Sequence, residues 1–247
     1  MPAQGTDQHR TWVMQNTAAR AALHMADVRV HLFVDKKPSG ATDADDDAVH
    51  GDDISIDVVR QSTLDAVQDL ADAKNMGVLC MCARKVPSQR SSGTMSQEDE
   101  LCRRTTLGEA LRAAQKQGMY PIVHQGVIAV ENVRVLVGPG PEYDAYGAAA
   151  IPPAFAVLAA AAPPRSDMWV DGIERVLSAA QEMGLDTLVL GAWGCGGRRK
   201  DPSIVAHRFR DVIGGARAKV LAPKLRRIVF AIPGYSAFTA FQSVLLP

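Results

Sequence analysis

From residue 78 onward, apolar residues form short continuous runs that are closed by Gly, Pro or charged residues. Such runs are typical of strands that are buried on both faces of a sheet. Four of them stand at residues 78–83, 156–162, 185–190 and 227–232. We expect these four segments to be adjacent strands of one central sheet.

Segments with apolar residues at helical spacing lie between these strands. They cover residues 105–118, 169–184 and 203–213, and Gly118 is predicted to close the first of them. Residues 126–137 predict one or two further strands. Strands that alternate with helices predict an α/β fold, with a mixed, mostly parallel central sheet and helices on both faces.

The segment before residue 78 predicts another strand and helix. Residues 54–59 alternate as a strand does, and Ser62 or Thr63 can cap a helix that runs through Leu70. Gly77 is predicted to end this helix.

The first 50 residues are predicted to be an N-terminal extension, and residues 51–247 the main domain. The extension contains a helix that begins at Thr11, a half-buried strand at residues 28–34, and an acidic loop. This loop carries Asp43 and residues 45–47, which are all Asp, and such a cluster is expected to stay solvated.

Composition narrows the classes of function. Of 247 residues, 47% are hydrophobic, which is enough for one substantial core. Lys plus Arg and Asp plus Glu both count 27, so no basic field favours DNA, and no DNA partner is inferred. No apolar run is long enough to span a bilayer, and no signal peptide is evident, so we expect an intracellular protein, cytoplasmic or nuclear, without a membrane partner.

The cysteines predict neither a disulfide framework nor a metal site. Their number and spacing are too sparse for either, so buried free thiols are expected, with no metal and no cofactor. The four are Cys80, Cys82, Cys102 and Cys195.

Ligands of largely parallel sheets bind beyond the carboxyl ends of the strands. The most informative strand end is the one after residue 190, where Gly191, Gly194, Gly196 and Gly197 follow. Glycines permit close backbone approach, and the next helix can present free N–H groups to a phosphate. The alternative is that these glycines only make a tight turn, and the two interpretations stay open.

Three stretches of sequence resemble the microbial-type poly(ADP-ribose) glycohydrolases. Residues 191–202 read GAWGCGGRRKDP, where the family motif is roughly G-A-W-G-C-G-x-F-x-N-x-P. Residues 97–107 read QEDELCRRTTL, against Q-E-E-x-L-C-R-R-S-x-L, and residues 156–164 match an apolar family strand that ends in Ala-Ala-Pro. The resemblance covers about residues 54–232 and implies a macrodomain-like fold and a divergent member of the family.

The resemblance also implies a ligand and a reaction. Family members bind ADP-ribose in a cleft at these strand ends and hydrolyse ribose–ribose or ribose–protein bonds. A carboxylic acid protonates the departing oxygen, and Glu98 and Asp99 stand at the positions of the family's two glutamates. The residues implied in ligand binding are Gln97, Ser88, Gln89, Arg90, Gly194, Cys195, Gly196, Gly197 and Arg198.

Three parts of the family pattern are altered. Asp99 is one methylene shorter than the family's principal acid, and Ser88-Gln89-Arg90 replaces a three-glycine loop that curls around the diphosphate. Arg198 replaces an aromatic residue on the ribose side, and Lys200 replaces an Asn. Alternatively, the basic side chains are solvated loop charges, and residues 98–100 simply begin a helix.

Two functions follow from this pattern. The first is a divergent ADP-ribose-binding protein with weakened or lost glycohydrolase activity, whose partner is ADP-ribose, a related nucleotide or polyanion, or another protein. The alternative is an active ADP-ribose glycohydrolase that uses Asp99 or Glu98 as its acid.

Overall fold

Seven strands form one sheet in this computed structural model, which describes Thr17, Ala21 and residues 24–33, 54–87, 96–123, 126–138 and 153–246. The strands are β1 (Arg29–Phe33), β2 (Ser55–Val59), β3 (Met76–Met81), β4 (Val127–Val133), β5 (Phe155–Ala160), β6 (Thr187–Leu190) and β7 (Arg227–Ala231). The helices are α2 (Thr63–Asp69), α3 (Gln97–Arg104), α4 (Leu107–Lys116), α5 (Trp169–Glu182), α6 (Pro202–Ile213), α7 (Ala216–Leu221) and α8 (Tyr235–Leu245), with single 3-10 turns at Met25–Asp27 and Ser166–Met168.

The sheet is mixed and mostly parallel. Its strand order is β1-β4-β5-β3-β6-β7-β2, and β5, β3, β6, β7 and β2 all run in one direction. β4 runs antiparallel to both of its neighbours, β1 and β5, so β1 shares the direction of the other five strands. The four continuously apolar segments are adjacent as β5-β3-β6-β7, which confirms the predicted core of the sheet.

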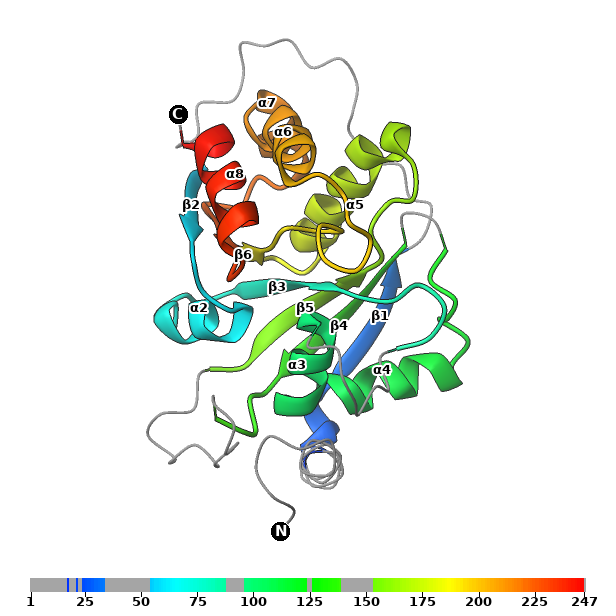
Figure 1. Ribbon diagram of the computed structural model, residues 1–247. Coiled ribbons are helices and arrows are strands. Elements are labelled where there is room, and N and C mark those ends of the chain that lie inside the picture. The colour runs from blue at the N-terminus through cyan, green and yellow to red at the C-terminus, as the bar shows by residue number, and fades with distance from the viewer. Residues whose placement is uncertain are drawn as a thin grey trace, which may run out of the picture.

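Helices cover both faces of the sheet, as predicted (Figure 1). Side chains of α5, α6, α7 and α8 pack on one face, and side chains of α2, α3 and α4 pack on the other. Alternate residues of β3 point to opposite faces of the sheet. Leu79 packs in the core under α5 to α8, and Val78 and Cys80 pack in the core under α2 to α4. Three aromatic rings, Phe209, Phe230 and Phe241, join α6, β7 and α8, with centroids 5.2 to 6.2 Å apart.

The prediction that Gly77 ends a helix is wrong. Helix α2 begins after the predicted cap Ser62 but ends at Asp69, and Gly77 lies inside β3. A Cβ at this position would stand 2.2 Å from Leu185 Cδ1, so the glycine lets the segment before β6 pack against β3. Gly118, in contrast, follows α4 with φ +79°, as a helix-terminating glycine does.

The front part of the chain contributes to the same sheet. The predicted strand is confirmed as β1, which pairs antiparallel with β4. Of the predicted helix from Thr11, the structure describes Thr17 and Ala21, and Ala21 packs against Leu136 and Val137. The acidic loop at Asp43 and residues 45–47 lies outside the described residues, and the domain boundary at residue 50 stays a prediction.

Candidate functional site

The carboxyl ends of β3, β5 and β6 meet at one edge of the sheet, which we call the carboxyl edge and which comprises residues 81–83, 160–164 and 191–200. The backbone N–H of Cys82 donates to Ala160 O at 3.2 Å, which joins β3 to β5. A Cβ at Gly191 would lie 3.0 Å from Met81 Cε, so β6 leaves the sheet directly beside β3. Three strand ends implied in ligand binding are therefore neighbours.

The turn between β6 and α6, residues 191–201, is fixed by its own hydrogen bonds. Gly194 has φ +77°, and a Cβ there would lie 3.2 Å from Ala162 Cβ, so both backbone conformation and packing favour glycine. The Lys200 N–H donates to Gly194 O at 3.1 Å, and Lys200 Nζ donates to Pro164 O at 3.3 Å. These contacts hold the β6–α6 turn against the loop after β5.

Gly196 and Gly197 differ from Gly194. Cβ atoms built on them would meet no atom within 4 Å among the described residues, and neither has a positive φ. Packing therefore explains glycine at positions 191 and 194 but not at positions 196 and 197. The latter two leave an open backbone surface on the β6–α6 turn, and a ligand can approach such a surface closely.

Trp193 anchors this turn in the core. Its side chain is 2% exposed, and it meets Trp169 edge-on with ring centroids 5.6 Å apart. Its Nε1–H donates to Ala160 O at 3.3 Å, so the indole joins the β6–α6 turn to the end of β5. Such a ring fixes the position of the glycines that surround it.

The cysteines are free thiols, as predicted, and three are buried while Cys195 is partly exposed. Burial, together with the negative charge of Asp201, raises the pKa of Cys195 to about 12. Burial also raises the pKa of Cys80, Cys82 and Cys102. Thiols with raised pKa values are protonated at neutral pH and are poor nucleophiles. The ligand contact expected of Cys195 stays a prediction.

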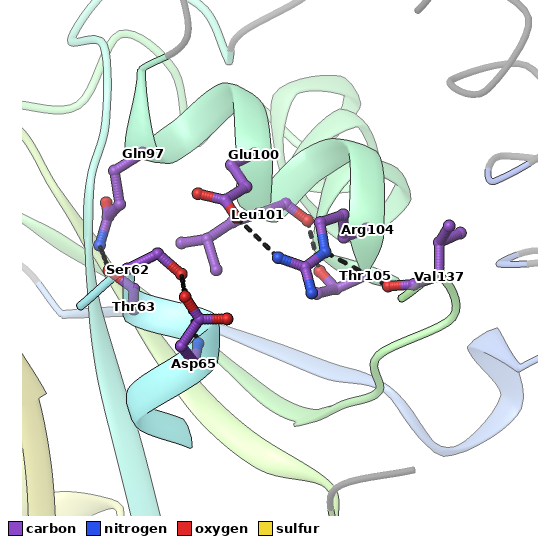
Figure 2. Close-up of polar contacts among 9 residues, drawn as sticks. All are labelled: Ser62, Thr63, Asp65, Gln97, Glu100, Leu101, Arg104, Thr105 and Val137. Atoms are coloured by element: carbon purple, nitrogen blue, oxygen red, sulfur yellow. Dashed lines mark hydrogen bonds and ion pairs between the residues drawn. The ribbon is translucent and has the colours of Figure 1, made fainter. Parts of the chain in front are cut away.

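Gln97 connects α3 to the end of β3. Its Oε1 accepts from Met81 N–H at 2.8 Å, and its Nε2 donates to Leu79 O at 2.8 Å and to Thr63 Oγ1 at 3.0 Å. Figure 2 shows the side chain reaching down from α3 to Thr63. The amide continues the backbone ladder of β3, so Gln97 positions the first turn of α3 at the carboxyl edge.

The carboxylate of Glu98 is buried at the same place. Glu98 is 4% exposed, and its Oε2 accepts from Ala83 N–H at 2.8 Å. Glu100, two residues later, instead pairs with Arg104 at 2.6 Å, and Arg104 Nε donates to Val137 O at 3.3 Å (Figure 2). Glu98 therefore faces the end of β3, whereas Glu100 is held on the side of α3 that packs against residue 137.

Asp99 closes the start of α3. It is 3% exposed, and its Oδ2 accepts from Ser96 Oγ–H at 2.5 Å and from Ser96 N–H at 3.2 Å. Ser96 Oγ in turn accepts from Asp99 N–H at 3.1 Å. This reciprocal pair is a capping box, which satisfies backbone donors that the helix itself leaves open.

The structure does not describe every predicted site residue. Ser88, Gln89 and Arg90 lie outside the described residues, which resume at Ser96 after Pro87. Within the described ranges, no His, Cys, Asp and Glu side chains are grouped so that they could hold a metal ion. None of the helices that the structure describes combines the length and apolar character needed to cross a membrane.

Fold and site together define an α/β protein with a mixed sheet, a fixed glycine-containing turn and a pair of buried carboxylates where parallel strands end. Residues 7–132, just over half of the chain, match the model of the microbial-type poly(ADP-ribose) glycohydrolase (PARG) catalytic domain. The chain belongs to this family, and its fold is macrodomain-like.

Solved structures of bacterial relatives share the fold. The poly(ADP-ribose) glycohydrolase of Thermomonospora curvata is 21% identical, with a TM-score of 0.72 over 96% of this chain and 97% of that chain. Its complex with the inhibitor ADP-HPD gives 20% identity and a TM-score of 0.71 over the same shares. The Deinococcus radiodurans enzyme in complex with ADP-ribose is 24% identical, with a TM-score of 0.65 over 78% of this chain and 84% of that chain. A comparison with curated proteins finds no match.

Proposed function

We propose that this protein binds ADP-ribose at the carboxyl edge and that it hydrolyses poly(ADP-ribose) weakly or not at all. The observation that supports weak or absent hydrolysis is the capping box, in which both Ser96 N–H and Ser96 Oγ–H donate to the carboxylate of Asp99. Binding is supported by family membership and by the relative from D. radiodurans, whose structure contains ADP-ribose.

Glycosidic hydrolysis needs a carboxylic acid that protonates the departing oxygen while the anomeric carbon gains oxocarbenium character. Asp99 stands at the family's position for this acid, but its arm is one methylene shorter. Its carboxylate is also turned back onto the start of α3. To reach a ligand it must give up its bonds to Ser96, and losing a helix cap costs about 1 kcal/mol.

Neighbouring carboxylates do not replace Asp99 without rearrangement. Glu98 accepts from Ala83 N–H, and Glu100 is paired with Arg104. A shift of either group toward a ligand leaves a backbone N–H or a buried guanidinium without that bond, which costs about 1–3 kcal/mol or more. The weakened activity therefore follows from the whole first turn of α3.

The second candidate function is an active glycohydrolase with Asp99 or Glu98 as the acid. Two buried carboxylates next to the carboxyl edge favour it, since Gln97 fixes the first turn of α3 on β3. In this candidate function, the binding of a substrate offsets the cost of about 1 kcal/mol for breaking the capping bonds of Asp99. Hydrolysis assays separate the two candidates, and calorimetry tests the binding that both require.

A tyrosine at Gly197 tests where ADP-ribose binds. The added ring fills open space over the β6–α6 turn, so we expect Gly197→Tyr to weaken ADP-ribose binding at least tenfold, or about 1.4 kcal/mol, in calorimetric titration. We expect the fold to be unchanged, because a Cβ there meets no described atom within 4 Å and Gly197 has no positive φ.

Gly215→Tyr is the matched control. Gly215 also has open space around it, but it follows the far end of α6. We expect this variant to bind ADP-ribose as the unsubstituted protein does. Equal affinity of the Gly197→Tyr variant would place the ligand away from this turn.

A further inference from the structure

The rim of the β6–α6 turn carries two exposed arginines, Arg198 and Arg199. Among the described residues, neither forms an ion pair, whereas several other arginines do, including Arg104, Arg112, Arg217 and Arg227. The nearest acidic residue along the turn, Asp201, caps α6 by accepting from Ser203 N–H and Ile204 N–H. Two adjacent cations that no described carboxylate pairs with attract an anion from solution.

The backbone that carries these arginines is fixed. Arg199 has φ +50°, in the left-handed region that residues other than glycine seldom adopt. Its N–H donates to Gly196 O at 2.8 Å, and the next residue, Lys200, is tied to Gly194 O and Pro164 O. The guanidinium groups are therefore presented from a rigid turn, which lowers the entropy lost when they bind a ligand.

Arg198 lies near the end of the neighbouring strand β3. Burial and the negative charge of Glu98 raise the pKa of Cys82, which follows β3, and the positive charge of Arg198 opposes that rise to a smaller extent.

The positive charge of Arg198 and Arg199 can make up for the loss of the family's three-glycine loop elsewhere in the sequence. Ser88-Gln89-Arg90 stands where the family has three glycines, and glycine, which has no Cβ, is the residue that lets a backbone wrap anionic oxygens most easily. A diphosphate then needs other donors. Arginine supplies them well, because its planar fork can bind two phosphate oxygens at once.

We propose that Arg198 and Arg199 form a diphosphate clamp, which holds the diphosphate of ADP-ribose through side-chain charge. The clamp rests on the proposed binding of ADP-ribose and adds that the phosphates, more than the ribose, determine affinity. Arg198 is thus a specificity-determining residue, since the family places an aromatic side chain at its position.

Calorimetric titration with ADP-ribose, ADP and adenosine tests the clamp. We expect ADP-ribose and ADP to bind at least about tenfold more tightly than adenosine, which has no phosphate. Arg198→Ala and Arg199→Ala each weaken ADP-ribose binding by about tenfold or more, as the loss of a charge-assisted bond predicts. Arg198→Lys keeps the charge but loses the fork, and falls between Arg198→Ala and the unsubstituted protein.

Arg29→Ala is the matched control. Arg29 is also exposed, but it begins β1 and lies near the amino ends of the parallel strands, away from the carboxyl edge. We expect its affinity for ADP-ribose to be unchanged, and thermal unfolding to be the same for all four variants because the substituted residues are exposed.

The outcomes separate the clamp from the proposed function. If the unsubstituted protein binds ADP-ribose and the Arg198→Ala and Arg199→Ala variants bind it equally well, the clamp is wrong and the proposed function stands. Adenosine that binds as tightly as ADP also overturns the clamp alone. If the unsubstituted protein does not bind ADP-ribose, both proposals fail.

Discussion

Hydrolysis of poly(ADP-ribose) by this protein is expected to be at least about 100-fold slower than by an active family member at the same enzyme concentration. A catalytic group displaced by about 1 Å loses on the order of 100-fold in rate. Asp99 is shorter by one methylene, and its Oδ2 accepts two hydrogen bonds from Ser96. Release of ADP-ribose from the polymer, followed by chromatography, measures the rate.

Asp99→Glu alone is not expected to restore family activity, because Ser88-Gln89-Arg90 and Arg198 still replace the family's three glycines and its aromatic residue, and groups that act together in a transition state are not repaired one at a time. Asp99→Asn is the matched control, since it keeps the size and a hydrogen-bond acceptor for Ser96 but has no acidic proton. Residual hydrolysis that survives Asp99→Asn means that Asp99 is not the acid. A rate for the unsubstituted protein comparable with that of an active relative would overturn this account and favour the active glycohydrolase.

Trp193→Ala is expected to lower the free energy of unfolding by about 3–5 kcal/mol, as is usual when a large buried aromatic side chain is removed. Trp193 is 2% exposed, contacts Trp169 and donates to Ala160 O, so its loss leaves a cavity and removes one of the two hydrogen bonds that Ala160 O accepts. Urea unfolding, monitored by far-ultraviolet circular dichroism, measures the change.

Trp193→Phe separates the ring from the hydrogen bond. Phenylalanine keeps an aromatic side chain against Trp169 but removes the donor to Ala160 O, so we expect a smaller loss than for alanine. If Trp193→Ala lowers the unfolding free energy by less than about 1 kcal/mol, the indole does not anchor the β6–α6 turn in the way described.

Much of the fold could be predicted because its strands are continuously apolar. The segments that form β3, β5, β6 and β7 are buried on both faces of the sheet. Their sequences are therefore apolar almost throughout and show no helical periodicity. The sequence predicts a helix end at Gly77 because a glycine after a helical pattern commonly terminates a helix. The actual reason for glycine at this position is Leu185, which lies more than 100 residues later, and local sequence does not show such a contact.

The candidate site was only partly predictable. The family motif located Gln97, Glu98 and Asp99, and the structure puts them in the first turn of α3. The spacing Ser96-x-x-Asp99 is itself a capping signal that could have indicated how Asp99 is engaged. The hydrogen bonds of Gln97 could not be predicted, because they depend on where β3 lies beneath α3.

Positions 196 and 197 show what the sequence left open. The pattern alone could not distinguish a ligand-binding glycine from one that makes a turn. The structure explains Gly191 and Gly194 by close packing, and at Gly194 also by a positive φ, and it finds no packing reason at Gly196 and Gly197. A ligand-binding role therefore stays a prediction for Gly196 and Gly197, and the Gly197→Tyr variant tests it.

A crystal structure of the protein with ADP-ribose tests the central claim most directly. We predict the diphosphate within hydrogen-bond distance of Arg198 at the β6–α6 turn, with the Asp99 carboxylate still bound to Ser96 N–H and Oγ–H. Contradiction would come from ADP-ribose bound away from the carboxyl edge, or from an Asp99 carboxyl group that has left Ser96 and lies about 3 Å from the oxygen at the anomeric carbon.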